Sequence, residues 1–235
     1  MGLCDFFKKE PDRPTVHVED FEIIQTDVHV KERGNYKTKT GNPRGLIVHF
    51  TAGHNNPVGT LNSLSSRGLS CLVMDDAGKV YRAKNQALND VGYHAGNSKI
   101  HGYSGASLYC MGMEICNAGE LTLYKGKYYP WWCFDSKKNF KGGKSIPEDQ
   151  IRFITKNADN YRIGAFHKYT SEQEESLVKF CLWQLKVNPE FKIDWIMGHD
   201  EVAVPLGRKS DPGGSLSLTM PDFREFLRIK YRGGE

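Results

Sequence analysis

Two short, largely apolar runs in this sequence each lead into a histidine. The run Gly45–Phe50 is continuous and contains His49 near its end, and the run over 191–197, which includes Lys192 and Asp194, is followed by Gly198 and His199. A continuous apolar run such as the first is typical of a strand buried on both faces, which occurs in sheets covered by helices. Because neighbouring parallel strands end at the same edge of a sheet, the two runs predict an α/β fold in which both histidines face one crevice.

The other elements expected from the sequence fit the same architecture. They are a helix over 57–66, a hairpin of strands over 69–74 and 79–83, a strand over 108–116, and a terminal helix that opens at Pro221. Thr170 is expected to cap a further helix, with Gln173 at the capping-box position. We therefore predict a single mixed β-sheet flanked by helices on both faces.

The domain organisation follows from where this pattern starts and where it is interrupted. Residues 1–44 contain Pro11 and Pro14 and predict an N-terminal extension, with one or two strands over 16–30. Residues 45–235 form the expected globular domain. About fifty residues, 119–168, separate two expected elements of that domain, which is long for a loop and predicts an insertion.

Composition excludes several classes of protein. Of the 235 residues, 39% are hydrophobic, and no window approaches eighteen consecutive apolar residues, so we expect no membrane insertion. The formal charge of +4 is small and dispersed, which argues against a nucleic-acid partner but fits weak attraction to an anionic polymer. The first residues lack the apolar core of a signal peptide, so we expect synthesis in the cytoplasm without one.

The loop that follows the second apolar run carries a concentration of reactive side chains. It contains His199 and Asp211, with Lys209 between them. Together with His49, these residues give two imidazoles and one carboxylate, a zinc ligand set that leaves a fourth position open for water. A lysine beside such a metal suggests a hydrolytic reaction in which a developing oxyanion is stabilised.

Each of these residues also has a structural interpretation. The histidines can be hydrogen-bonded groups at strand ends, Asp211 can shape a turn before Pro212, and Lys209 can be a solvated loop cation. Glu114 interrupts an apolar run, which is costly unless the carboxyl group is satisfied. Spacing alone does not decide between these interpretations.

Four segments, taken in order, resemble the zinc-dependent N-acetylmuramoyl-L-alanine amidases, a group that includes phage endolysins and peptidoglycan recognition proteins. They are Val48-His49-Phe50-Thr51-Ala52-Gly53, Tyr93-His94-Ala95-Gly96, Met111-Gly112-Met113-Glu114, and the stretch from His199 to Gly213 that ends in Gly-Arg-Lys-Ser-Asp-Pro-Gly. The likeness covers roughly residues 45–232 and implies the amidase and peptidoglycan-recognition-protein fold.

The resemblance also implies roles for individual residues. The implied roles are zinc ligation by His49, His199 and Asp211, general base catalysis by Glu114, oxyanion stabilisation by Lys209, and substrate contact by His94. Gly112, on the same face of its strand as Glu114, is expected to leave room for substrate. Ser70 stands where some phage members have a tyrosine near the metal, which favours Glu114 as the base.

The implied activity is hydrolysis of the amide bond between N-acetylmuramic acid and L-alanine in bacterial peptidoglycan. We expect a monomeric, bacteriolytic and antimicrobial endolysin of the phage type that reaches the cell wall after holin-type release. One alternative is a cytoplasmic recycling amidase that acts on soluble muropeptides. Another is a peptidoglycan-recognition module that binds the wall without cleaving it.

The insertion over 119–168 has two open interpretations. It is rich in aromatic residues and lysines, including Tyr124, Trp131, Trp132 and Phe140. It can be a lid or extra subsite that stacks sugar rings and pairs with wall carboxylates. It can equally be a satellite subdomain whose aromatic side chains form a small core of their own.

Overall fold

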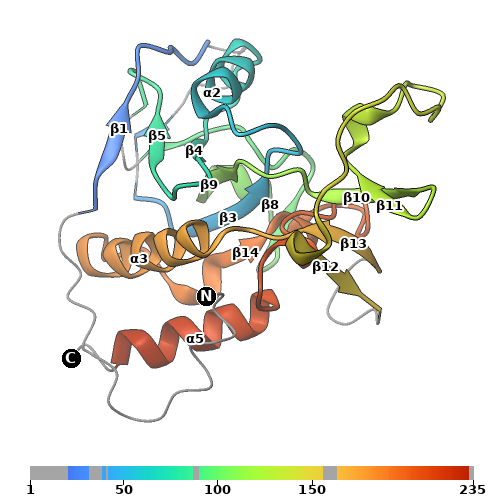
Figure 1. Ribbon diagram of the computed structural model, residues 1–235. Coiled ribbons are helices and arrows are strands. Elements are labelled where there is room, and N and C mark those ends of the chain that lie inside the picture. The colour runs from blue at the N-terminus through green and yellow to red at the C-terminus, as the bar shows by residue number, and fades with distance from the viewer. Residues whose placement is uncertain (1–20, 32–38, 41, 87–89, 156–162, 233–235) are drawn as a thin grey trace.

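The computed structural model has a central mixed sheet, and it describes residues 21–31, 39–40, 42–86, 90–155 and 163–232. The strand order is β1-β5-β4-β9-β3-β14 (Figure 1). The strands are β1 (Ile23–Gln25), β3 (Gly45–Phe50), β4 (Leu72–Met74), β5 (Val80–Arg82), β9 (Cys110–Ile115) and β14 (Ile196–Gly198). Only β4 and β5 pair antiparallel within this sheet, as the expected hairpin requires. The expected mixed α/β architecture is confirmed.

Strand β3 lies in the interior of the sheet, between β9 and β14, and its side chains are apolar on both faces. Leu46, Ile47 and Val48 are each fully buried. β3 pairs in parallel with β9 on one side and with β14 on the other. Parallel pairing of this kind requires helices on both faces, and the chain provides them.

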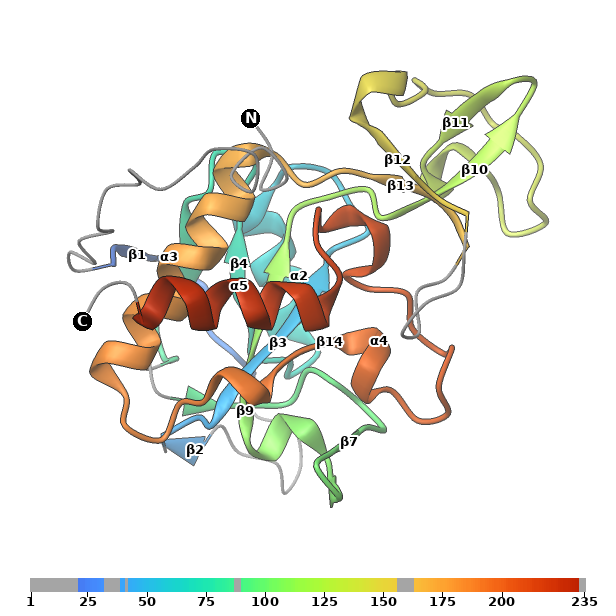
Figure 2. The same ribbon diagram turned by 90° about the horizontal axis from the view of Figure 1, so that it is seen from below.

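The helices cover the two faces unequally. Helix α2 (Pro57–Ser66) lies on one face, where Leu61 and Leu64 pack against Val73 of β4. Helices α3 (Ser171–Val187) and α5 (Met220–Arg232) lie on the opposite face and enclose the larger core (Figure 2). A short helix, α4 (His199–Val202), follows β14 directly.

Local capping sets where α2 and α3 begin. The Asn56 side chain accepts a hydrogen bond from the backbone N–H of Gly59, and Pro57 occupies the first turn of α2. Thr170 and Gln173 form the expected capping box at the start of α3. Both helices therefore start where the sequence places their caps.

Residues 119–168 are called the arm below, and their described part, 119–155 and 163–168, forms a second sheet beside the main body (Figures 1 and 2). Its order is β11-β10-β13-β12. The strands are β10 (Glu120–Tyr124), β11 (Lys127–Tyr129), β12 (Ile151–Ile154) and β13 (Gly164–His167). All the pairings within this sheet are antiparallel. The arm is attached to the body at both ends, after β9 and before α3.

Smaller elements complete the described part of the chain. Two ribbons pair β2 (Lys39–Thr40) with β6 (Asp90–Val91), and β7 (Lys99–Ile100) with β8 (Tyr103–Ser104). Single 3₁₀ turns lie at Ala106–Leu108, Trp131–Cys133, Glu148–Gln150, Ile193–Trp195 and Gly213–Ser215. None of the helices in the described residues is long and apolar enough to cross a membrane.

The strands expected over 191–197 and 16–30 are only partly formed in the described residues. The strand expected over 191–197 is shorter, because Ile193–Trp195 forms a 3₁₀ turn and only Ile196–Gly198 pairs with β3. Of the strands expected over 16–30, β1 covers Ile23–Gln25. The N-terminal extension lies largely outside the described residues, including all of 1–20.

Candidate metal centre

His49 and His199 meet because β3 and β14 are parallel neighbours that end at the same edge of the sheet. In register, Gly198 of β14 pairs with Val48 of β3, so each histidine comes one residue later. Both side chains are almost completely buried, with 1% of His49 and 3% of His199 exposed. The expectation that both imidazoles share one crevice is confirmed.

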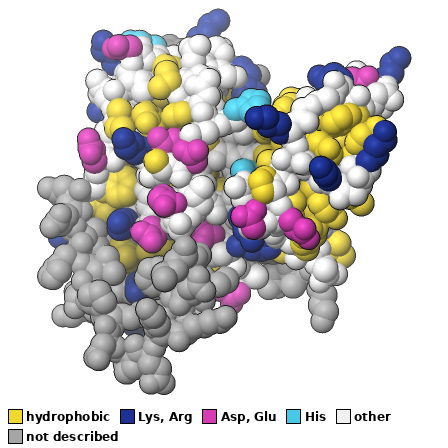
Figure 3. Space-filling model, in the orientation of Figure 1, with side chains coloured by type: hydrophobic (Ala, Val, Ile, Leu, Met, Phe, Trp, Pro, Cys, Tyr) yellow, Lys and Arg dark blue, Asp and Glu magenta, His cyan; other side chains and the backbone are white. Residues whose placement is uncertain are grey.

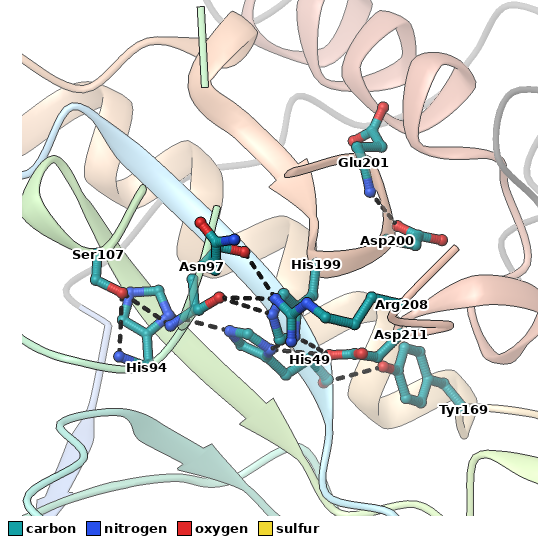
Figure 4. A network of polar contacts seen from close by, with 11 residues as sticks. His49, His94, Asn97, Ser107, Tyr169, His199, Asp200, Glu201, Arg208 and Asp211 are labelled. Atoms are coloured by element: carbon teal, nitrogen blue, oxygen red, sulfur yellow. Dashed lines mark hydrogen bonds and ion pairs between the residues drawn. The ribbon is translucent and has the colours of Figure 1, made fainter. Parts of the chain in front are cut away.

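Asp211 completes a triangle of three potential ligand atoms (Figure 4). Its Oδ2 atom lies 2.8 Å from His49 Nδ1 and 2.9 Å from His199 Nδ1. The two Nδ1 atoms are 3.0 Å apart. The backbone of Asp211 is held in place by the N–H of Asp200, which donates to its carbonyl oxygen at 2.8 Å. The loop that follows α4 thus folds back to the strand ends.

The hydrogen bonds of His94 determine which nitrogen of His49 carries the proton. His94 Nε2 lies 2.9 Å from the carbonyl oxygen of Cys110, which can only accept, so this nitrogen is protonated. In neutral His94, Nδ1 is then an acceptor, and His49 Nε2 lies 3.1 Å from it. His49 therefore donates from Nε2, and its Nδ1 presents a lone pair toward Asp211.

His199 is oriented by the same kind of contact. Its Nε2 atom lies 3.1 Å from the carbonyl oxygen of Ala95, so Nε2 is the donor and Nδ1 carries the lone pair. The segment that supplies this carbonyl is itself fixed, because the Ser107 hydroxyl oxygen accepts from the backbone N–H groups of His94 and Ala95. Tautomers set by a partner on the outer nitrogen are characteristic of metal-binding histidines.

The donor set fits a metal ion. With these tautomers, His49, His199 and Asp211 each direct a lone pair to the same point, at mutual distances between 2.8 and 3.0 Å. Three electron-rich atoms in contact repel one another unless a cation lies among them. Two imidazoles and one carboxylate form a tetrahedral set that suits zinc and leaves one position open. These three residues are also a cluster that can hold a metal ion.

The protonation states of the buried groups agree with this arrangement. Burial, with a smaller contribution from neighbouring histidines, lowers the pKa of His49 to about 4 and that of His94 to about 3, so both rings are neutral at pH 7. Burial alone raises the pKa of Asp211, but its contacts with His199 and His49 outweigh this effect and hold it well below its usual range. The site therefore contains the neutral rings of His49 and His94 and the ionised carboxylate of Asp211.

Glu114 lies next to His49 on the adjacent strand. The two residues are paired in register between β9 and β3, so their side chains point to the same side of the sheet. The pKa of Glu114 is raised to about 8, mainly by burial and also by Asp211, while Lys209 acts in the opposite direction. A carboxyl group with this pKa can accept and return a proton near neutral pH.

A cleft of about 510 Å³ opens over this cluster. The six residues that the sequence singled out all line it, namely His49, His94, Glu114, His199, Lys209 and Asp211. Lys209 is half-buried on the same loop as Asp211. The structure thus brings together every candidate site residue, and their individual roles stay predictions.

One expectation about the cleft was wrong in its detail. Gly112 was expected to leave room for substrate, but a Cβ atom at this position would lie 2.7 Å from Cγ of His94. The absence of a side chain at Gly112 therefore makes room for the His94 ring. His94 is only 8% exposed.

Two residues that support the site, Tyr169 and Arg208, were not predicted from the sequence. The Tyr169 hydroxyl donates to the carbonyl oxygen of His49 at 3.1 Å and steadies the end of β3. The Arg208 guanidinium donates to the carbonyl oxygen of Asn97 at 2.8 Å and ties the Lys209 loop to the segment that orients His199. Arg208 stands inside the Gly-Arg-Lys motif, which was a usable signal, whereas nothing in the sequence distinguished Tyr169.

Comparisons with known proteins give a consistent result. The family model described as N-acetylmuramoyl-L-alanine amidase matches residues 39–214. No curated protein matches the sequence at a significant level. Among solved structures, a selenomethionine derivative of AmpD is similar with a TM-score of 0.51 and 16% identity, over 92% of this chain and 95% of that chain. AmiD from E. coli, solved with anhydro-N-acetylmuramic acid-L-Ala-D-gamma-Glu-L-Lys, has a TM-score of 0.52 and 16% identity, over 83% of this chain and 61% of AmiD. At these identities the structures support the fold.

Proposed function

This chain belongs to the N-acetylmuramoyl-L-alanine amidase family, and from that premise we propose that it hydrolyses the amide bond between N-acetylmuramic acid and L-alanine in peptidoglycan with the help of zinc. The observation that carries the proposal is the convergence of three lone pairs from His49, His199 and Asp211 at the floor of the cleft. We propose that these residues are the zinc ligands.

Three protein ligands leave the fourth position of a tetrahedral metal ion open for water or substrate. When bound, zinc supplies Lewis-acid polarisation of the scissile carbonyl and of an attacking water. The outer contacts of the ligands keep their lone pairs aimed inward, through His94 for His49 and through the Ala95 carbonyl for His199. This preorganisation means that neither imidazole has to change tautomer when the ion binds.

In this proposal Glu114 provides acid-base catalysis, and Lys209 stabilises the developing negative charge. Glu114 takes the proton of the attacking water and returns it to the leaving nitrogen of L-alanine, for which its raised pKa is suited. Lys209, which lines the same cleft, contributes a positive charge where the oxyanion of the tetrahedral intermediate develops. We propose that His94, which lines the cleft, contacts the substrate while it orients His49.

We further propose that the physiological substrate is the intact cell wall, as for a phage-type endolysin, and that residues 45–235 form the catalytic domain with the arm as its insertion. The support for wall over soluble muropeptides is the surface of the arm, where six lysines between residues 120 and 144 are exposed. A recycling amidase that acts on small soluble fragments has no need for such a surface.

The test is product analysis on purified sacculi. Mass spectrometry should find stem peptides with a new L-alanine amino terminus and an intact glycan strand, and turbidity of permeabilised bacteria should fall. Chelation should abolish both effects and zinc should restore them. Release of peptides with any other new terminus would refute the amidase assignment. Activity on soluble muropeptides without wall lysis would refute the endolysin role alone.

A further inference from the structure

The arm is joined to the catalytic cleft through the loop that follows His49. The indole N–H of Trp131 donates to the carbonyl oxygen of Ala52 at 2.6 Å. One residue along the arm, Trp132 packs against His54 with ring centroids 4.3 Å apart. Ala52 and His54 both line the cleft. Two neighbouring tryptophans of the arm therefore hold the rim of the cleft.

Most aromatic side chains of the arm pack against other aromatic rings. The ring of Phe140 lies 4.6 Å from that of Tyr124 and 4.9 Å from that of Tyr129, measured between centroids. Phe134 adds a further edge contact with Phe140 at 5.6 Å. These rings form a small core of the arm, as one of the two interpretations of this segment predicts.

Trp131 is different, because it is 60% exposed. Its orientation is nevertheless fixed by the hydrogen bond to Ala52 and by an edge contact with Trp132, whose ring is 6.2 Å away at 83°. An exposed indole with a satisfied N–H and a fixed plane is a preorganised stacking surface, because little conformational entropy is lost when a ligand covers it.

The arm also concentrates positive charge. Between residues 120 and 144 there are six lysines and two carboxylates, and all six lysines are exposed. Figure 3 shows dark-blue Lys and Arg side chains interleaved with yellow hydrophobic ones on the arm, and cyan histidines in the groove between the arm and the body. A second cavity of about 500 Å³, lined by His54 and Trp132 among others, shares Gly53 and His54 with the cleft.

We propose that the arm is a built-in carbohydrate-binding surface, with Trp131 as its stacking platform, that holds the peptidoglycan strand beside the cleft. The proposal rests on the proposed function. The indole face suits the apolar face of a pyranose ring, and the lysines suit the carboxylates of the stem peptides. Peptidoglycan carries both groups on one polymer, and Trp131 contacts the cleft rim directly, so a strand on the platform enters the cleft with its neighbouring residue.

The test is cosedimentation of the full chain with purified sacculi at 4 °C, over times too short for hydrolysis. Trp131→Ala should weaken binding about tenfold, a factor of the size that loss of one aromatic stacking contact produces. Trp131→Phe keeps a ring but loses the N–H, and it should retain most of the binding. Ile229→Ala is the matched control, because Ile229 is an equally exposed apolar residue at 58%, on α5, and it should bind like the wild type.

A second variant separates the contribution of charge to sacculus binding from that of stacking. Lys137→Gln combined with Lys138→Gln and Lys141→Gln should weaken binding at low salt and converge with the wild type at high salt, because exposed charges are screened. Wild-type binding by Trp131→Ala, or an absence of binding by the wild type, would overturn the proposal. Equal losses in Trp131→Ala and Trp131→Phe would also overturn it, since the hydrogen bond to Ala52 would then be the whole contribution.

These outcomes are distinct from a failure of the proposed function. Binding through Trp131 without release of peptides that begin with L-alanine would refute the amidase and leave the carbohydrate surface standing. Amide cleavage by a chain whose binding is insensitive to Trp131 would do the reverse.

Discussion

The hydrogen-bond chain from Cys110 through His94 to His49 predicts that zinc affinity depends on a residue that does not touch the metal. His94→Phe keeps a ring of similar shape and removes the acceptor for His49 Nε2. In the metal-free protein His49 can compensate by moving its proton to Nδ1 and donating to Asp211, 2.8 Å away. Zinc removes this option, because it requires the Nδ1 lone pair and leaves a buried Nε2–H without a partner.

The size of the effect follows from that orphaned group. A buried donor without an acceptor costs about 1–3 kcal/mol, and 1.4 kcal/mol is a factor of ten. We therefore expect His94→Phe to bind zinc about 10- to 100-fold more weakly, in line with the usual effect of outer-shell partners. His94→Gln restores an amide acceptor and donor and should recover part of the loss.

The assay is competition with a chromophoric zinc chelator, combined with thermal unfolding of the metal-free protein. His101→Phe is the control, because His101 is exposed and bonded to the Asp194 carbonyl, away from the cluster. A His94→Phe variant with wild-type zinc affinity would refute the tautomer argument. A fall in metal-free stability as large as the fall in zinc binding free energy would show that His94 is merely structural.

Three further predictions concern the cleft and the arm. Glu114→Gln should bind zinc normally and lose about 10²- to 10⁴-fold in turnover, measured on sacculi at equal zinc content; near-wild-type rates would place the base elsewhere. Lys209→Ala should lower kcat about 10²- to 10³-fold with little change in zinc content, and a change confined to KM would assign it to binding. Burial lowers the pKa of His167 from 6.5, so acidification through about 6.5 protonates the unfolded chain first and lowers the free energy of unfolding. The melting temperature should therefore fall less between pH 7 and 5 in His167→Gln than in the wild type, and equal falls would contradict this.

Sequence reasoning succeeded where one local signal decided the structure. Continuous apolar residues identified β3, and caps located α2 and α3, because burial and capping act over a few neighbouring positions. It overestimated β14, where the chain turns into a 3₁₀ segment before pairing. A tertiary contact accompanies this turn, since a Cβ at Gly45 would lie 2.1 Å from the Trp195 carbonyl oxygen. Within 191–197 the sequence carries only the polar residues Lys192 and Asp194 as a sign of the shorter strand.

The arm shows a second limit of prediction from sequence, because the same types of side chain serve two different functions. Aromatic side chains stabilise a small core and also bind sugars, so composition alone left both interpretations open. The structure separates them residue by residue, because Phe140 is surrounded by other rings while Trp131 is fixed in orientation and exposed. Only the position of each ring relative to solvent carries this distinction.

The site itself shows why candidate metal ligands are easier to predict from sequence than the groups that orient them. Metal ligands must have particular side chains, so the proposed ligands His49, His199 and Asp211 could be picked out from the sequence. The groups that orient them are partly backbone carbonyls, at Ala95 and Cys110, and a carbonyl imposes no residue type. What such a contact does impose is space, and the clearest trace of the His94 ring in the sequence is therefore a glycine, Gly112, on the strand facing it. The glycine two residues before Glu114 thus indicates a buried neighbouring ring rather than space for substrate.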